Sequence, residues 1–538
     1  MFKFILLFIT FIAISLAAVS QDKSDWIYSY PDACTSITVG KKASKDGSVM
    51  TSHTDDSHRT RSWMDIIPAG DHPAGSTCNM YKRVSCDSFA MPSYSHIKIG
   101  EIPQVPHTYG FVNTAYPCMN EMQLGIGEST FGGRESLQSD SGLIDCQRLV
   151  RLMLERCTTA RQAIMMAGEL VKKYGWNDYG ECLTIADKNE VWHFEIVGPG
   201  KGKTGAIWAA RRVPDDHVSV NANASTIKEI NLRDREHFMA SENIFEMARD
   251  SGWWNPKTET FRFCYAYAPE SRQSIAARRR EWRVFDLLAP SLNLDPKDQD
   301  FPFSVKPDTL VTLEKMVSIF KDYYEGTPYD MTMDITTTDK DGKTVVSPLA
   351  NPFMPYDQLG LHNVKGSWFH EDSKTGHIEF LGERTIARWY TMYGTIIQCR
   401  NWLPDEIGGV VWLAQDNIAT SIYIPVYCSV TDLPEPYKTP GRKNGYTTKS
   451  AWWAFNRLGT LASQRWGDMR KDVDAVWLPM QKELFANQAA TEKQALGIDD
   501  KARRVQFLNA YSNSWGLKVV ESAWKLGDFL WTKYDEKF

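Results

Sequence analysis

The chain has 538 residues, of which 43% are hydrophobic and 24% are charged, so it is long enough to bury a large core. Its formal net charge of −5 at pH 7 gives no reason to expect nucleic acid or an anionic membrane surface as a partner. No Gly/Ser linker, low-complexity tract or internal repeat divides the sequence, which indicates a large globular protein.

Residues 1–20, MFKFILLFITFIAISLAAVS, combine one lysine, an unbroken apolar run and a small-residue ending. This pattern is typical of a secretory signal peptide, with residues 18–20 as the expected cleavage site. A membrane anchor is the alternative, but the run is short for a span and no basic stop-transfer cluster follows it. We therefore expect export to the periplasm or the extracellular space, with no membrane segment left after cleavage.

Cys34 opens a predicted β-hairpin. An apolar strand, residues 34–40, leads through the Asp46-Gly47 turn to a second strand, residues 48–54. If residues 21–33 were removed as a propeptide, Cys34 would carry a thiol and a free α-amino group together. An α-amine has a reference pKa of about 7.7–8.0, so it can act as a general base beside the nucleophile.

Further along the chain, apolar periodicity predicts both strands and helices. The expected strands cover residues 182–187, 190–197, 205–212, 217–222, 386–398 and 408–426. The expected helices cover residues 143–174, 309–324, 450–464, 468–490 and 500–532. These patterns alone support a mixed α/β or α+β class, with residues from about 468 to 538 as a helical C-terminal extension.

The ten cysteines raise the question of disulfides, because an exported chain meets an oxidising compartment. Cys78 and Cys86 lie close together in a polar stretch and could pair, and Cys146 or Cys157 could pair with a distant cysteine. The alternative is that most cysteines are small buried hydrophobes. We expect at most about two disulfides, and no metal site, because neither a CxxC pair nor Cys/His ligand spacing occurs.

The stretch from Cys34 to Asp56 resembles the opening of the C69 dipeptidase family, relatives of the secernins within the N-terminal nucleophile hydrolases. The family pattern is Cys-Thr-x-x-x-Val-Gly-Lys-x-Ala-Ser-x-Asp-Gly-Ser, followed by a basic and an acidic residue. The matching residues are Cys34, Thr35, Val39, Gly40, Lys41, Ala43, Ser44, Asp46, Gly47 and Ser48, then His53 and Asp56. At the basic position the family often has arginine, and a histidine there makes the contact dependent on pH.

Later blocks resemble the family in the same order along the chain. Residues 119–133, which include Thr130, are similar to its second block, and residues 182–198 resemble a hairpin shared with the bile salt hydrolases. The late strand and helix of the family have counterparts in residues 408–427 and 450–462.

Two further blocks carry residues with implied roles. Asn221 and Asn223 stand where such enzymes place an oxyanion-stabilising asparagine, and Asn221 is the favoured one. Residues 277–290 resemble the helix that carries the family's active-site arginine, and that role aligns with Arg280. A run of three arginines, 278–280, is otherwise typical of a solvated helix face.

The resemblance implies a fold and an activity. The implied fold is α+β, the αββα sandwich of N-terminal nucleophile hydrolases, over residues 34–538. The implied activity is hydrolysis of dipeptides through a thioester on Cys34, with small peptides as substrates and no metal or organic cofactor.

The resemblance also assigns roles to the other site residues. Asp56 would orient the Cys34 amine, Asn221 would stabilise the oxyanion, and Arg280 would tune this network or bind a substrate carboxylate. His53, Thr130 and Asn223 would contact the substrate.

Several alternatives stay open at this stage. Asp56 could cap a turn instead, since the sequence around it is turn-like, and His53 could be a partly exposed strand residue. A related amidase acting on conjugated bile acids, penicillins or N-acyl amino acids is a second candidate function, and a catalytically inactive envelope binding protein is a third. The sequence does not decide whether the protein is a homo-oligomer.

Overall fold

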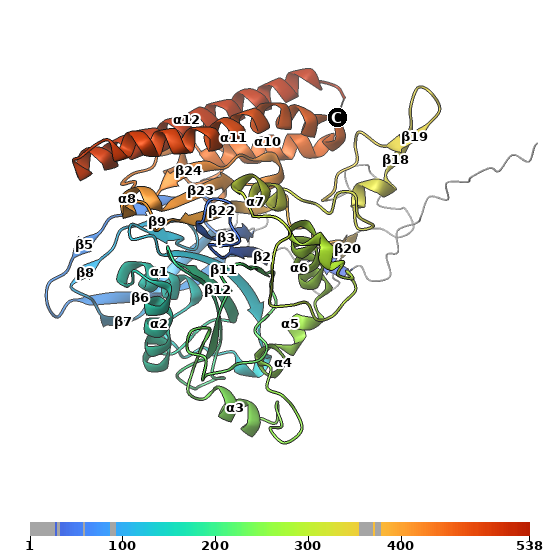
Figure 1. Cartoon of the computed structure of the whole chain (residues 1–538). Helices are drawn as coiled ribbons and strands as arrows, with labels where there is room; N and C mark the ends of the chain where they lie inside the picture. The colour runs from blue at the N-terminus through green and yellow to red at the C-terminus, as the bar shows by residue number, and fades with distance from the viewer. Residues whose placement is uncertain are drawn as a thin grey trace, which may run out of the picture.

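The computed structural model describes residues 27–29, 33–57, 60–86, 93–353, 369–371 and 378–537. The predicted signal peptide, residues 1–20, lies outside this part of the chain. Of the predicted leader, the structure describes only residues 27–29, which form strand β1 (Ile27–Ser29), and Ala33, which begins strand β2. Figure 1 shows the whole arrangement.

Two large antiparallel sheets form the centre of the molecule. In spatial order, the seven-stranded sheet consists of β17 (Ser304–Val305), β15 (Val218–Asn221), β2 (Ala33–Val39), β3 (Val49–Asp56), β22 (Thr391–Cys399), β23 (Val410–Gln415) and β24 (Ile424–Tyr427). The eight-stranded sheet consists of β16 (Phe238–Ala240), β14 (Ile207–Arg212), β13 (Val191–Val197), β12 (Gly180–Ala186), β11 (Gly125–Gly132), β10 (Met119–Asn120), β9 (Phe111–Asn113) and β4 (Asp65–Ile67).

Smaller sheets accompany this centre. They are the pairs β5 (Gly70–Asp71) with β8 (His107–Thr108), β6 (Thr77–Cys86) with β7 (Ser93–Pro103) and β18 (Thr336–Thr338) with β19 (Thr344–Val346), and the set of β1, β21 (Ile378–Gly382) and β20 (Phe369–Glu371). The described part of the leader therefore pairs with a strand far along the chain, because β1 runs antiparallel to β21.

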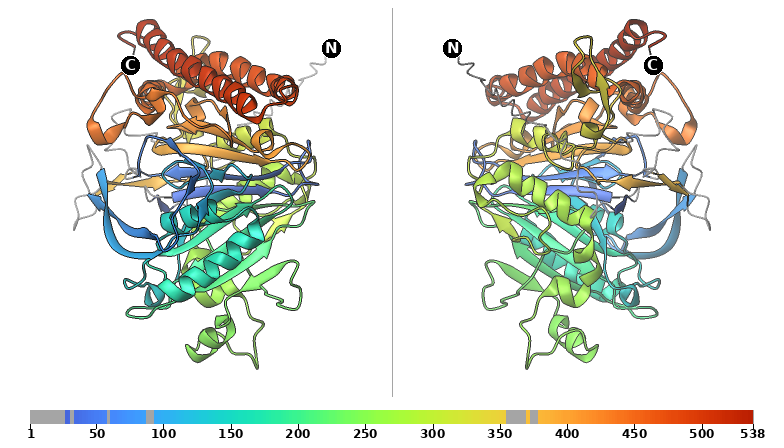
Figure 2. Two further views of the ribbon diagram at one scale, coloured as in Figure 1. Left: turned by 90° about the vertical axis from the view of Figure 1, so that its left-hand side faces the viewer. Right: turned by 90° about the vertical axis from the view of Figure 1, so that its right-hand side faces the viewer.

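Helices cover the outer faces of both large sheets, so the layers run helix, sheet, sheet, helix (Figures 1 and 2). Helices α10 (Ala451–Gln464), α11 (Trp466–Leu496) and α12 (Lys501–Lys533) pack on the seven-stranded sheet, and α1 (Cys146–Arg156) and α2 (Ala160–Tyr174) pack on the eight-stranded one. The remaining helices are α3 (Ile244–Asp250), α4 (Phe263–Tyr267), α5 (Pro269–Gln273), α6 (Ile275–Leu288), α7 (Leu313–Phe320), α8 (Asp405–Gly408) and α9 (Glu435–Lys438). The α+β class predicted from the sequence is confirmed.

The predicted first hairpin is present as β2 and β3, and the residues of its turn explain why it forms. Gly47 has a φ of +86°, a conformation that glycine adopts without steric cost. The Asp46 carboxylate accepts hydrogen bonds from the backbone N–H of Ser48 (3.0 Å) and from its hydroxyl (2.6 Å), which closes the turn locally. The hairpin therefore fixes Cys34, at one end of β2, opposite Asp55 at the end of β3.

Several predicted elements have different boundaries in the structure, and the helix expected over 309–324 covers only Leu313–Phe320, as α7. The helix expected over 143–174 is two helices, because Thr159 accepts a hydrogen bond from Gln162 N and so caps the start of α2. The strand expected over 408–426 is two strands, since Asp416 turns the chain at a φ of +56° after β23. The strand expected to begin at residue 386 begins at Thr391.

The nine cysteines whose side chains the structure describes are free thiols, and most of them are buried. The suggested pairing of Cys78 with Cys86 is wrong, because both residues lie on strand β6. Eight residues along a strand span about 26 Å, far more than a disulfide can bridge. Burial of most of the remaining cysteines agrees with their alternative interpretation as small core residues.

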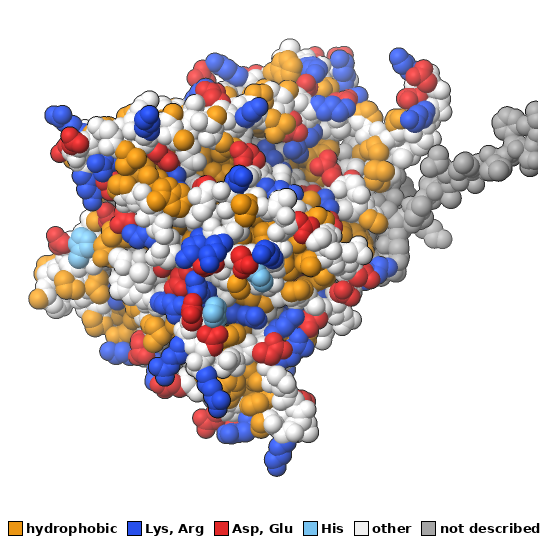
Figure 3. Space-filling view, in the orientation of Figure 1, with side chains coloured by type: hydrophobic (Ala, Val, Ile, Leu, Met, Phe, Trp, Pro, Cys, Tyr) orange, Lys and Arg blue, Asp and Glu red, His pale blue; other side chains and the backbone are white. Residues whose placement is uncertain are grey.

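None of the helices in the described ranges is long and apolar enough to cross a membrane. On the face shown in Figure 3, lysine and arginine side chains are interspersed with aspartate and glutamate, so neither sign of charge dominates. This distribution agrees with the small net charge of the chain.

The two large sheets approach each other closely where β11 and β12 cross β2 and β3. Ser36 Oγ donates to Glu128 O (2.8 Å), and the hydroxyls of Thr51 and Thr184 lie 2.7 Å apart, so polar contacts join the facing strands. Gly127 makes this approach feasible, because a Cβ atom at that position would overlap with the carbonyl oxygen of Ser52.

We predict that Gly127→Ala destabilises the protein by about 1–3 kcal/mol, because the added methyl group must push the two sheets apart. Urea unfolding of the purified variant measures this change. Gly70→Ala is the matched control, since the nearest atom to a Cβ there is 3.8 Å away. Equal unfolding free energies for the two variants would contradict the close approach of the sheets.

Candidate active site

Cys34 lies at the start of β2, between the neighbouring strands β15 and β3 of the seven-stranded sheet. Its side chain is only 7% exposed. Three of its atoms make separate polar contacts. The backbone N–H donates to Asn223 Oδ1 (3.0 Å), the carbonyl oxygen accepts from Arg280 Nη1 (2.7 Å), and the thiol donates to Glu128 Oε2 (3.4 Å). The backbone nitrogen, the carbonyl oxygen and the sulfur of Cys34 are thus each held by a hydrogen bond.

Asn223 follows β15 and has a φ of +65°, a left-handed conformation that asparagine tolerates better than most residues. Its Oδ1 accepts hydrogen bonds from the Cys34 N–H and from Arg280 Nη2 (2.8 Å), while its Nδ2 donates to Thr130 O (2.6 Å). Both ends of the amide are therefore engaged, and its oxygen faces the backbone nitrogen of Cys34.

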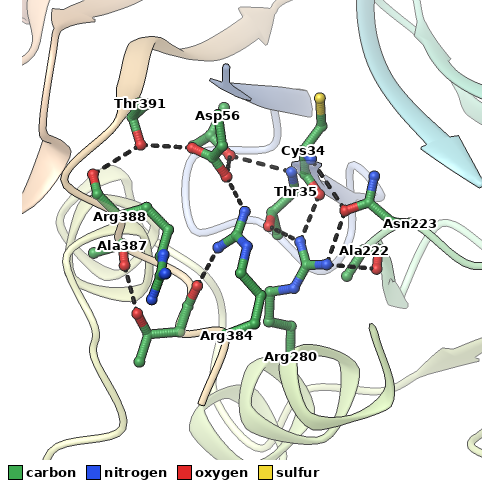
Figure 4. A network of polar contacts seen from close by, with 12 residues as sticks. Cys34, Thr35, Asp56, Ala222, Asn223, Arg280, Arg384, Ala387, Arg388 and Thr391 are labelled. Atoms are coloured by element: carbon green, nitrogen blue, oxygen red, sulfur yellow. Dashed lines mark hydrogen bonds and ion pairs between the residues drawn. The ribbon is translucent and has the colours of Figure 1, made fainter. Parts of the chain in front are cut away.

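Arg280 joins three segments around the nucleophile (Figure 4). It extends from α6 and donates to Thr35 Oγ1 (2.9 Å) and Ala222 O (2.9 Å) in addition to its bonds with Cys34 and Asn223. Every one of these acceptors is a neutral oxygen. Burial, together with the nearby Arg384 cation, lowers the pKa of Arg280 to about 9, so the guanidinium keeps its positive charge at neutral pH.

The run of three arginines, residues 278–280, is buried and is not the solvated helix face that such a run usually forms. Arg278 donates to backbone carbonyl groups, and Arg279 forms an ion pair with Glu383 (3.3 Å). The alternative interpretation of Arg280 as a surface residue is therefore wrong.

Asp56 lies at the end of β3, opposite Ala33. Its carboxylate forms an ion pair with Arg384 and accepts a hydrogen bond from Thr391 Oγ1 (2.5 Å), as Figure 4 shows. In the described chain the Cys34 amide donates to Asn223 and not to Asp56. The expected contact between Asp56 and a free Cys34 amine therefore stays a prediction.

His53 and Glu128 approach the Cys34 sulfur from two different sheets. His53 is on β3 and Glu128 is on β11, and their side chains are 2% and 1% exposed. His53 Nε2 lies 3.3 Å from Glu128 Oε2, the same oxygen that accepts from the thiol, and its Nδ1 lies 3.3 Å from the Tyr393 hydroxyl. The alternative interpretation of His53 as a partly exposed strand residue is therefore wrong.

Glu128 belongs to a buried carboxyl pair with Glu181 on β12. The Thr130 hydroxyl lies 3.0 Å from Glu128 Oε1 and 2.9 Å from Glu181 Oε1. Burial raises the pKa of Glu181 well above its usual range, and repulsion from Glu128 adds to this rise. Burial opposes ionisation of Glu128 too, but its contacts with His53, Glu181 and Thr130 together outweigh that effect and lower the pKa of Glu128. Glu128 is thus the ionised member of the pair, and Glu181 is the protonated one.

The environment of Cys34 keeps its thiol protonated at rest. Burial raises the pKa of the thiol well above its ordinary value, and the negative charges of Glu128, Asp55 and Asp56 raise it further. A nucleophilic thiolate can form here only when a base accepts the proton or when positive charge enters the site.

The described residues also include sets of possible metal ligands. The donor atoms of Cys34, His53 and Glu128 lie within 4.8 Å of one another, as do those of Glu128, Cys146 and Glu181. Thiolate, imidazole and carboxylate are ligands that Zn²⁺ accepts. Sequence spacing did not reveal these sets, because their members lie on different strands.

Asn221, the asparagine favoured from the sequence, does not contact Cys34 through any hydrogen bond in the described chain. Its Nδ2 donates to Ala224 O (2.8 Å), and its Oδ1 has no hydrogen-bond partner among the described residues. The structure thus brings Cys34, Asn223 and Arg280 together directly, with Thr130 bonded to Asn223 through its carbonyl group.

Sequence reasoning did not assign a role to Glu128, Glu181, Arg384 or Thr391. Glu128 stands two residues before Thr130 in a block that already resembled the family, so its acidic side chain was an available signal. Thr391 meets Asp56 because β22 pairs with β3, and Arg384 lies in the segment that leads into β22. Both residues are more than 300 positions from Asp56 in the sequence. No local pattern reveals such a contact.

Residues 33–478 match Peptidase family C69. The chain belongs to this family. The matched region begins one residue before Cys34 and includes every site residue described above. The resemblance of the first hairpin to this family, stated from the sequence, is therefore confirmed.

Curated relatives are similar to this chain over most of their length. A probable dipeptidase of Latilactobacillus sakei is 26% identical over 499 residues, which cover 89% of this chain and 91% of the relative. Dipeptidase A of Lactobacillus helveticus is 25% identical over 424 residues, covering 76% and 78%. Probable dipeptidase B of Streptococcus pyogenes serotype M1 is 23% identical over 529 residues, covering 95% and 96%.

The contacts of the two asparagines predict that Asn223→Ala impairs turnover more than Asn221→Ala. Loss of Asn223 Oδ1 leaves donors of Cys34 and Arg280 without their acceptor, which should lower kcat/KM by about 10-fold to 100-fold, equivalent to about 1–3 kcal/mol. Steady-state kinetics on a dipeptide substrate compare the two variants. A larger loss in Asn221→Ala would instead favour Asn221 as the working amide.

Proposed function

We propose that the protein is an exported cysteine dipeptidase that hydrolyses the peptide bond of dipeptides through a thioester on Cys34. The observation that carries this proposal is the constellation around Cys34, whose nitrogen, carbonyl oxygen and sulfur each have a dedicated polar partner. Membership of Peptidase family C69 and the names of the curated relatives support the substrate class.

The proposed reaction requires a free amino group on Cys34. Removal of residues 21–33 turns the backbone nitrogen that now bonds to Asn223 into an α-amine at the same end of β2. This amine accepts the thiol proton, directly or through a water molecule, because the acidic surroundings of the sulfur oppose spontaneous ionisation. No metal or organic cofactor takes part in the proposed steps.

The sulfur then forms a bond to the scissile carbonyl carbon, whose oxygen takes up negative charge. The protonated α-amine delivers its proton to the leaving amino acid as the C–N bond breaks. Water hydrolyses the resulting thioester and releases the first amino acid. Asn221 or Asn223 is the proposed oxyanion donor, in an arrangement that frees an amide N–H from its present acceptor.

Arg280 and Asp56 have supporting roles in this proposal. The Arg280 cation lies against the Cys34 carbonyl group and stabilises negative charge that develops beside it. The Asp56 carboxylate, held by Arg384 and Thr391, is the proposed anchor for the α-amine once Ala33 has left. Export follows from the predicted signal peptide, residues 1–20, and places the enzyme in the periplasm or outside the cell.

We predict that Cys34→Ala abolishes hydrolysis of dipeptides, because it removes the nucleophile, and that Cys34→Ser retains at most trace activity. The thermal unfolding temperature should change little, since one small side chain is truncated. Cys78→Ser is a matched control, because Cys78 is a free thiol on β6, in a two-stranded sheet separate from the two sheets that carry the site.

The same assay separates the proposed function from the amidase alternative. A panel of unmodified dipeptides and glycine-conjugated bile acids should show turnover of the dipeptides only. Turnover of dipeptides by Cys34→Ala would show that another residue carries the chemistry, and turnover of conjugates alone would favour an amidase.

A further inference from the structure

Glu128 accepts a hydrogen bond from the thiol of the nucleophile, but no step of the proposed hydrolysis uses this carboxylate. Its Oε2 lies 3.4 Å from Cys34 Sγ and 3.3 Å from His53 Nε2, on a strand of the opposite sheet. Since the Glu128 side chain is 1% exposed, water does not screen its charge. A buried carboxylate at this position governs which groups of a substrate can approach the sulfur.

The covalent structure of a dipeptide fixes where its amino group must lie during attack. The α-nitrogen is two bonds from the scissile carbonyl carbon, or about 2.5 Å away. The sulfur approaches that carbon to about 3–3.5 Å before the bond forms. The α-nitrogen therefore comes within a few ångströms of the sulfur, which is the region that Glu128 Oε2 occupies.

Glu181 places a second carboxyl oxygen in the same cluster. Glu181 is 2% exposed, and its Oε2 has no hydrogen-bond partner among the described residues, although its Oε1 lies 2.9 Å from the Thr130 hydroxyl. An ammonium group carries three N–H donors and needs several acceptors when it leaves water. Glu128 can supply a charged acceptor, and the protonated Glu181 can supply a neutral one through the oxygen that does not carry its proton.

The other side of Cys34 has the opposite character. Arg280 and Asn223 lie there, against the backbone nitrogen and carbonyl oxygen of the nucleophile. The Arg280 cation repels an ammonium group, so a charged amino terminus is directed toward Glu128. This asymmetry orients a dipeptide with its α-nitrogen toward β11 and β12.

We propose that Glu128, supported by Glu181, binds the free α-ammonium group of the substrate and thereby restricts this site to peptides with an unblocked amino terminus. The inference rests on the proposed function, hydrolysis of dipeptides at Cys34. It adds to that function a group that distinguishes dipeptides from the N-acylated substrates of an amidase.

The test compares a dipeptide such as Ala-Ala with N-acetyl-Ala-Ala for the wild-type enzyme and for Glu128→Gln. For each protein, turnover gives the ratio of the kcat/KM values for the two peptides, and competitive inhibition gives the ratio of their inhibition constants. Because Cys34, His53 and Glu128 can also hold a divalent metal ion, every assay contains a chelator. Glu135→Gln is the matched control, since Glu135 is an exposed carboxylate seven residues further along the chain.

We expect the wild type to prefer the free dipeptide strongly. Glu128→Gln should lower kcat/KM for the free dipeptide by about 30-fold or more, while the value for N-acetyl-Ala-Ala changes less than about threefold. Alkylation of Cys34 by iodoacetamide should be as fast in Glu128→Gln as in the wild type, or faster, because a negative charge beside the thiol has been removed. Glu135→Gln should behave as the wild type.

Several results would overturn the inference. Glu128→Gln could lower kcat/KM equally for both peptides, or it could leave the preference for the free dipeptide unchanged. Either result would show that Glu128 does not recognise the amino group. Much slower alkylation would assign Glu128 to proton transfer from the thiol instead. If Glu128→Gln does not fold, Glu181→Gln provides the same comparison. We expect a smaller loss of kcat/KM for the free dipeptide in that variant. An unchanged preference for the free dipeptide would again contradict the inference.

Two outcomes for the wild-type enzyme separate ammonium recognition from dipeptidase activity. A wild-type enzyme that hydrolyses both peptides equally well would exclude ammonium recognition and leave the dipeptidase function intact. A wild-type enzyme that hydrolyses no dipeptide would remove both.

Discussion

The hydrogen bonds of one buried guanidinium group hold the active site together. Arg280 bonds to Cys34 and Thr35 on β2 and to Ala222 and Asn223 after β15, so a single side chain connects α6 with two neighbouring strands. A buried cation is costly unless its donors are satisfied, and here the acceptors are neutral oxygens placed by those strands. The geometry of the nucleophile and the location of this charge therefore depend on each other.

Cys34 lies between two regions of opposite electrostatic character. Arg280 lies against its backbone carbonyl group, whereas Glu128 lies on the side of its sulfur, with Glu181 in the same carboxyl pair. The cationic side favours the negative charge that develops during attack, and the acidic side opposes a resting thiolate. The Cys34 thiol is thus protonated and unreactive at rest, and its activation requires a base, a bound cation or both.

Much of this arrangement could be predicted from local sequence signals. The Asp46-Gly47 turn identified the first hairpin, and helical periodicity identified the long C-terminal helices, α11 and α12, although α11 extends six residues beyond the predicted end. The family pattern drew attention to Cys34 and Arg280, which the structure brings into contact. Local signals sufficed for these features because turns and helices depend on neighbouring residues.

Other features depend on contacts between distant segments and left no local trace. Glu128 meets the sulfur because β11 of one sheet crosses β2 of the other, and Thr391 meets Asp56 because β22 pairs with β3. The asparagine that bonds to Cys34 is Asn223, whose left-handed backbone conformation could not be read from the alternation of polar and apolar residues. The burial of three consecutive arginines is likewise decided by tertiary packing.

The most direct test of the central claim is the mass of the active protein, stopped with acid during turnover of a dipeptide. The account predicts a chain that begins at Cys34 and that carries, on the peptide containing Cys34, the added mass of the first amino acid of the substrate as a thioester. Full activity in protein that still retains residues 21–33, with no adduct on Cys34, would contradict it.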